Sequence, residues 1–91
     1  MPRDFQAFVD EIERSRKLKK RQGAGNSVYG SRVMPVLELY AGLVEFEERD
    51  AFQKALEMLL SDADPERRSF AVDICLGFFV FRDAIRVDRA R

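Results

Sequence analysis

Histidine is absent from this sequence of 91 residues, and cysteine occurs once. Without histidine, acid–base catalysis by imidazole and metal ligation by imidazole are excluded. The single thiol, Cys75, excludes an internal disulfide, and its place in an apolar helical pattern predicts a buried and reduced side chain. Catalysis by carboxylates alone would need a deep pocket, which a domain of this size rarely has. We therefore expect a protein that is not an enzyme and that uses no cofactor and no metal.

Glycine and proline are also scarce, with five and three residues. These are too few for the many turns of an all-β fold, whereas 46% hydrophobic and 35% charged residues are typical of amphipathic helices. We expect an all-α fold, a single small domain of about five helices. Long apolar runs are missing too: none approaches the ~20 residues of a membrane span, and the start has no signal-peptide pattern. A soluble cytoplasmic protein is therefore expected.

The sequence has no net charge, but its charged residues are distributed unevenly along the chain. Residues 1–32 carry eight basic residues (Lys or Arg) and four acidic residues (Asp or Glu). Residues 33–66 carry two basic and nine acidic residues, and residues 67–91 carry six basic and three acidic residues. The chain is therefore basic, then acidic, then basic. Such asymmetry bears on partners and solubility rather than on the fold.

The first helix is predicted from Phe5, Phe8, Val9 and Ile12, which recur at helical spacing with Glu13 turned away from them. Residues 14–21 follow with six positive charges, and glycines then end the helix, so residues 1–25 form an N-terminal helix and a basic linker. Cations are favoured at a helix C-terminus, which explains the run without a ligand. The alternative is a nucleic-acid patch, with the candidate residues Arg16, Lys17, Lys19, Lys20 and Arg21. The lack of interleaved aromatic residues favours the solvated helix end.

Residues 26–91 are predicted to form the helical core. In its first part, Asn26 and Ser27 are good N-cap residues, and Pro35 interrupts the apolar pattern that follows. Either this second helix begins near Ser31, or it begins near Ser27 and bends at Pro35; we favour the bend. The predicted buried stripe consists of Val33, Val36, Leu37, Tyr40, Ala41 and Val44.

An acidic connection over residues 45–48 is expected to lead to a third helix that Asp50 caps. Its predicted inward face is Phe52, Ala55, Leu56, Leu59 and Leu60, and residues 61–63 close it. Asp64 is a strong N-cap for a fourth helix, because Pro65 fits the first helical position and Glu66 suits the first turn. The predicted buried residues of this fourth helix are Ala71, Ile74, Cys75 and Phe78.

Residues 77–81 are rich in phenylalanine, and we expect the fourth helix to end there in a tight turn. A short fifth helix over residues 82–89 would then return Ala84, Ile85 and Val87 to the core. Three phenylalanines cannot all point inward from such a turn. Phe79 and Phe81 are therefore candidate contacts, although packing in the core is the ordinary use of phenylalanine in a small domain.

The corner at Asp64 also carries a family resemblance. The chain, over roughly residues 5–90, is similar to a family of short bacterial HEAT-like proteins catalogued as domain of unknown function 2019. The positions that match are Asn26, Tyr29, Leu56, Leu59, Leu60, Asp64, Pro65, Arg67 or Arg68, and Ala71. The chain departs from the pattern at Pro35, in the extra basic residues 14–21 and in the phenylalanine-rich segment. The resemblance implies HEAT-like antiparallel helical hairpins and a protein-binding role of the kind that immunity proteins have when they neutralise a toxin.

The sequence leaves three functions open. The first is a protein-binding module, such as an immunity or inhibitor protein, whose acidic face steers it to a basic partner such as a nuclease. The partner-binding candidates are Glu38, Glu45, Glu47, Glu48, Asp50, Glu57, Phe79 and Phe81. An ordinary solvated face is the alternative explanation for these carboxylates. The second function is a nucleic-acid-associated accessory domain using the basic segment, and the third is a self-associating module that forms a homodimer through its phenylalanines.

Overall fold

Four α-helices account for most of residues 2–18 and 32–81, the parts of the chain that the computed structural model describes. They are α1 (Phe5–Arg16), α2 (Val33–Ala41), α3 (Phe46–Leu60) and α4 (Pro65–Val80), and no strand occurs within these residues. The all-α prediction is confirmed over this part of the chain. The predicted cap residues Asn26 and Ser27, the match at Tyr29 and the fifth helix over residues 82–89 lie outside the described residues.

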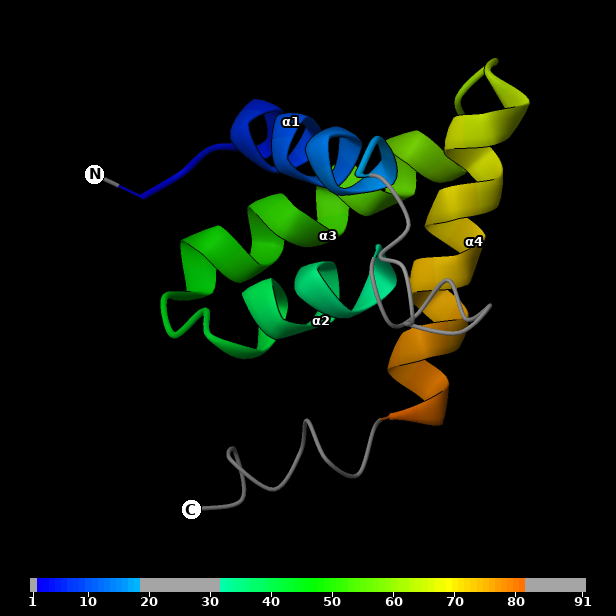
Figure 1. Cartoon of the computed structure of the whole chain (residues 1–91). Coiled ribbons are helices and arrows are strands. Elements are labelled where there is room, and N and C mark those ends of the chain that lie inside the picture. The colour runs from blue at the N-terminus through cyan, green and yellow to red at the C-terminus, as the bar shows by residue number, and fades with distance from the viewer. Residues whose placement is uncertain (1, 19–31, 82–91) are drawn as a thin grey trace.

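The helices pack in a layered arrangement around one hydrophobic core. In Figure 1, α1 and α3 run in the same direction, and α1 packs along α3. The last helix, α4, contacts both α2 and α3 and runs across the direction of the other helices in this view. This arrangement does not confirm the predicted HEAT-like antiparallel hairpin of α3 and α4.

One aromatic residue from each helix meets at the centre of the core. The Phe52 ring of α3 lies 5.6 Å from Phe8 of α1, 5.0 Å from Tyr40 of α2 and 6.2 Å from Phe78 of α4, measured between ring centroids. Aliphatic residues at helical spacing surround these rings, as the sequence pattern predicts. The buried ones include Ile12, Val33, Val36, Leu37, Ala55, Leu59, Ala71 and Ile74.

The corner between α3 and α4 confirms the predicted capping. Asp64 is the N-cap of α4, and its Oδ1 accepts a hydrogen bond from the backbone N–H of Glu66 at 2.9 Å. Pro65 occupies the first helical position, where its missing N–H would have no helical partner. Asp62 braces the turn by accepting from the backbone N–H of Asp64 at 2.8 Å, which lowers the pKa of the Asp62 carboxyl.

The predicted bend in the second helix is wrong. The helix begins at Val33, so Pro35 lies in its first turn, where a backbone N–H has no partner to lose. The helix also ends at Ala41, earlier than the apolar pattern suggested. Leu43 consequently takes the buried position after the helix, and Val44, which was expected to be buried, is exposed.

The predicted start of the third helix at Asp50 is also wrong. Glu45 is the N-cap of α3, and its side chain makes no capping hydrogen bond. Residues 46–48, expected as a connection, form the first turn, where the carboxylates of Glu47 and Glu48 suit the positive end of the helix dipole. Asp50 lies one turn further along and forms an ion pair with Lys54 at 2.9 Å.

The fourth helix ends within residues 77–81, as predicted, but only near their end, because α4 continues to Val80 and Phe81 is its C-cap. Gly77 is buried within the helix rather than ending it. Further expectations of burial are corrected: Leu60 is exposed, and five residues are half-buried, namely Tyr40, Ala41, Leu56, Cys75 and Phe78. The burial of Cys75 is enough to raise the pKa of its thiol. Within the described residues, no helix is long and apolar enough to cross a membrane.

Candidate protein-docking site

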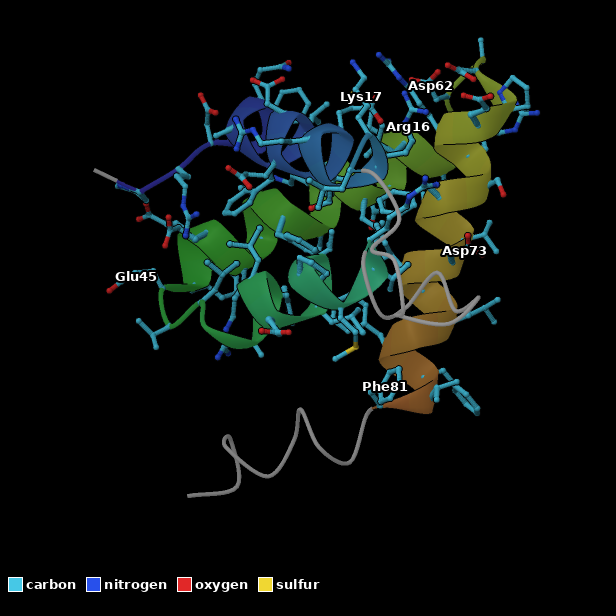
Figure 2. The ribbon with its side chains drawn as sticks, viewed as in Figure 1. Arg16, Lys17, Glu45, Asp62, Asp73 and Phe81 are labelled. Carbon is cyan, nitrogen blue, oxygen red and sulfur yellow. The ribbon has the colours of Figure 1, made fainter. Side chains whose placement is uncertain are left out.

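The most exposed large hydrophobic side chains of the described residues lie together between α2 and α3. Val44 is 80% exposed and Phe46 is 78% exposed, and the exposed carboxylates Glu45 and Glu47 alternate with them along the chain. We call residues 44–47 the tip. Figure 2 shows Glu45 at the end of the molecule that is far from α4. The tip therefore combines apolar surface with negative charge at a projecting position.

The tip is held by buried and hydrogen-bonded residues on both sides. Leu43 is buried in the core, and its carbonyl oxygen accepts from Arg49 Nε at 2.8 Å. The backbone N–H of Leu43 in turn donates to Tyr40 O at 3.0 Å, which ties the loop to α2. Val44 and Phe46 are thus presented from an ordered base. Such a base lowers the entropy that would be lost when the tip binds a partner.

A second tie comes from the N-terminal segment. The backbone N–H and the Nε of Arg3 donate to Glu48 Oε2 at 2.9 Å and 3.0 Å, and these bonds lower the pKa of the Glu48 carboxyl. The Arg3 guanidinium also lies over the Phe8 ring, 5.0 Å from its centroid. Glu48 is therefore engaged within the molecule, and it leaves Glu45 and Glu47 as the acidic groups of the tip.

The predicted acidic candidates do not form one patch. The carboxylates of Glu45 and Glu47 lie at the tip and make no hydrogen bond or ion pair with other described residues, while the backbone carbonyl of Glu45 accepts from the N–H of Arg49 at 3.1 Å. Asp50 is paired with Lys54. Glu57 lies ten residues after Glu47, or about 15 Å along α3 at the usual helical rise. Glu38 is exposed on α2, opposite the buried face of that helix. Of the six predicted carboxylates, Glu45 and Glu47 are therefore the two exposed ones that adjoin Val44 and Phe46.

The aromatic candidates also separate. Phe79 is exposed on α4, whereas Phe81 is half-buried and packs against the core. Figure 2 shows Phe81 at the C-terminal end of α4, on the other side of the molecule from Glu45. Phe79 and Phe81 therefore lie on a different side of the molecule from the tip.

The basic candidates are partly used inside the molecule. Arg16 Nε donates to Glu13 Oε2 at 2.9 Å, and Arg16 Nη1 donates to Glu66 Oε2 at 3.1 Å. Lys17 is the exposed C-cap of α1, and the other candidates, Lys19, Lys20 and Arg21, lie outside the described residues. The described part of the basic segment therefore offers Lys17 as an exposed cation, while Arg16 fixes α1 to α4.

Glu13 is the centre of this ion-pair cluster, although the sequence pattern placed it on the outer face. Its Oε1 also accepts from Arg67 Nε at 3.0 Å, and Arg67 reaches Asp62 at 3.3 Å. The hydrogen bond from Arg16, followed by the positive charges of Arg16 and Arg67, lowers the pKa of Glu13. Glu13 is buried because the corner before α4 places Arg67 against α1. This contact joins residues that are far apart in the sequence, so the local sequence pattern could not predict it.

A shallow groove of about 430 Å³ lies beside this cluster and is lined by Arg16, Arg32, Glu66 and Asp73 among others. Its charges are of both signs: Arg16 forms an ion pair with Glu66 at 3.1 Å, and Arg32 Nε donates to Leu18 O at 2.9 Å. Across residues 2–18 and 32–81, no group of three or more Cys, Asp or Glu side chains is placed to hold a metal ion.

Comparison of the chain with protein-family models, curated proteins and solved structures finds no match. The similarity to short bacterial HEAT-like proteins therefore stays a prediction from the sequence. The candidate functional site is therefore defined by the geometry of the tip alone.

The apolar half of the tip was missed by the sequence analysis. Val44 was assigned to the buried stripe because the helical period extends past the end of α2. Phe46 falls within the predicted acidic connection over residues 45–48 and was not among the predicted contacts. Its position between two glutamates, outside every predicted stripe, is the signal that could have identified it as an exposed aromatic residue.

Proposed function

We propose that this protein is a non-enzymatic protein-binding module that docks on its partner through the tip. The observation that carries the proposal is the exposure of Val44, in the anchored loop, and of Phe46, at the start of α3, next to Glu45 and Glu47. A phenylalanine that inserts into a pocket of a partner is a common centre of binding energy in protein interfaces.

The carboxylates indicate the chemistry of the partner. Glu45 and Glu47 flank the apolar side chains, and Glu47 lies in the first turn of α3. They would match basic residues around an apolar pocket, and they would speed the encounter through long-range attraction. A basic protein with an apolar pocket is therefore the best-matched partner.

A more specific form of the proposal is an immunity or inhibitor protein that neutralises a basic effector such as a nuclease. The family resemblance implies the same role. In this form, the acidic tip would occupy the site where the effector binds an anionic substrate. Binding and inhibition would then be lost together when the tip is altered.

The test is a binding titration with the purified product of a neighbouring toxin-like gene. Phe46→Ser is expected to weaken the complex by more than about tenfold, since loss of a central aromatic residue costs more than ~1 kcal/mol. The double change Glu45→Lys and Glu47→Lys is expected to slow association and to reverse its dependence on salt.

Phe79→Ser is the matched control, because it removes an exposed phenylalanine from a different surface and is expected to leave the affinity for this partner unchanged. A complex that tolerates Phe46→Ser and the double charge reversal would rule out the tip as the docking site. Failure of every neighbouring gene product to bind would rule out the immunity form of the proposal.

A further inference from the structure

Arg49, near the start of α3, forms hydrogen bonds on both sides of Val44. Its side-chain Nε donates to the carbonyl oxygen of Leu43 at 2.8 Å, and its backbone N–H donates to the carbonyl oxygen of Glu45 at 3.1 Å. The backbone bond joins residues i and i+4, as in any α-helix. The Nε bond lies outside the helical pattern and depends on the type of side chain at position 49. Arg49 therefore holds the backbone before and after Val44, and one of these two bonds is specific to arginine.

The side chain of Arg49 lies within an acidic part of the sequence. The four carboxylates within four residues of it belong to Glu45, Glu47, Glu48 and Asp50. Of these, Glu48 pairs with Arg3 and Asp50 pairs with Lys54. Among the residues that the structure describes, Arg49 forms no ion pair and is half-buried, with its Nε turned to a backbone carbonyl. The Arg49 side chain is thus used to hold the loop rather than to neutralise a neighbouring acid.

The Nε bond connects two elements at a short loop. The loop between α2 and α3 spans residues 42–45, and its N-cap residue makes no side-chain hydrogen bond to the start of α3. Leu43 is fixed on the α2 side by its buried side chain and its backbone N–H. The bond from Arg49 adds a side-chain connection on the α3 side. Val44 lies inside this bracket, and Phe46 begins the helix directly after it.

We propose that Arg49 is a positioning residue for docking: its Nε holds the tip in the conformation that binds the partner. This inference rests on the proposed function, because it concerns how the same site binds. A site that is ordered before binding loses less entropy when the complex forms. If the Nε bond is removed, a smaller fraction of molecules holds the tip in the binding conformation, and the apparent Kd rises by the inverse of that fraction.

Two substitutions separate the hydrogen bond from the charge. Arg49→Gln keeps a donor, because the Nε2 of glutamine is attached to the δ carbon, as the Nε of arginine is. Arg49→Met places a methyl group at the same position and has no donor. Both variants remove the positive charge, and both residue types are good helix formers. A difference between the two variants therefore measures the bond to Leu43.

The first measurement uses the free full-length chain and needs no partner. Amide hydrogen exchange and nitrogen-15 relaxation report the order of residues 43–47. Arg49→Met is expected to speed the exchange of the Leu43 amide and to lower the order parameter of Val44, whereas Arg49→Gln is expected to match the wild type. The amide of Arg68, which donates to the carbonyl of Asp64 at the corner, is the control for an intact fold. Equal order of the tip in both variants would overturn the proposal.

The second measurement is the binding titration with the purified product of the neighbouring toxin-like gene. Arg49→Met is expected to raise the Kd about twofold to tenfold over Arg49→Gln, the range set by the net contribution of one hydrogen bond. Arg49→Gln is expected to bind within about threefold of the wild type, because it restores the donor.

The two measurements distinguish this inference from the proposed function. An equal Kd for Arg49→Met and Arg49→Gln, in a complex that Phe46→Ser weakens, would overturn the positioning role and leave the tip as the docking site. A complex that tolerates Phe46→Ser would remove the proposed function, and the role of Arg49 in docking with it, whatever the order of the free tip.

Discussion

Glu13 shows how a single charged residue joins elements that are distant in the sequence. Its carboxylate is nearly buried and accepts hydrogen bonds from Arg16 of its own helix and from Arg67 of α4. These contacts lower the pKa of Glu13, so the folded state favours the ionised form. The ion pair with Arg67 links α1 to the corner that opens α4. A surface pattern of alternating charges in the sequence thus contains one carboxylate with a structural role.

Glu13→Gln is expected to reduce the free energy of unfolding by about 1–3 kcal/mol at neutral pH, because a buried charge-assisted hydrogen bond is lost. The contribution of Glu13 is complete above its ordinary pKa of 4.5 and is lost as the pH falls through the lower pKa of the folded state. The difference between wild type and variant should therefore shrink in acid. Urea unfolding at a series of pH values measures it.

Glu57→Gln is the control for this change, since Glu57 is an exposed acid on α3. Its effect is expected to stay within about 0.5 kcal/mol across the same pH range. A Glu13→Gln variant that matches the wild type at neutral pH would show that the cluster adds nothing to stability. A difference that grows in acid would contradict the assigned direction of the pKa shift.

At the scale of elements, the aromatic residues at the centre of the core hold the four helices together. Phe52 contacts an aromatic ring from each of the other three helices. Edge-to-face contacts of this kind add to the free energy gained from burying the rings. The loss of Phe52 would therefore weaken the packing of every helix at once.

Phe52→Ala is expected to lower the free energy of unfolding by about 3–5 kcal/mol, the usual cost of a large cavity in a core. Phe46→Ala, six residues earlier on the same helix, removes the same side chain from an exposed position and should cost less than about 0.5 kcal/mol. Urea unfolding followed by circular dichroism compares the two. Equal losses of stability in both variants would contradict the assigned positions of these rings.

The sequence predicted those elements whose signals are local. The apolar periods of α1, α3 and α4 were visible in the sequence, and the Asp64 cap with Pro65 behind it located the start of α4 correctly. Helix ends without such signals were missed. Glu45 caps α3 without a side-chain hydrogen bond, and Asp50, a better cap by residue type, lies inside the helix because residues 46–48 are already helical.

Pro35 was misread for a related reason. Proline is a helix breaker by type and glycine is a poor helix former, yet Pro35 and Gly77 are each tolerated where they stand. Pro35 lies in the first turn of α2, where no hydrogen bond is lost, and Gly77 is buried inside α4. Position within the helix and contact with the rest of the fold decide such cases, and both depend on the tertiary structure.

At the scale of the whole molecule, the acidic tip lies at one side and the exposed hydrophobic residues of α4 lie at the other. The acidic half of the tip could be predicted from the excess of carboxylates in residues 33–66. Its apolar half could not, because the exposure of Val44 depends on where α2 ends.

The central claim is that the tip is the docking surface, and mapping of amide chemical shifts tests it most directly. The isotopically labelled protein would be titrated with the product of the neighbouring toxin-like gene. We predict that the largest shifts fall on residues 43–49, with little change at the exposed residues of α4. Shifts confined to α4 or to α1, with the tip unchanged, would contradict the account.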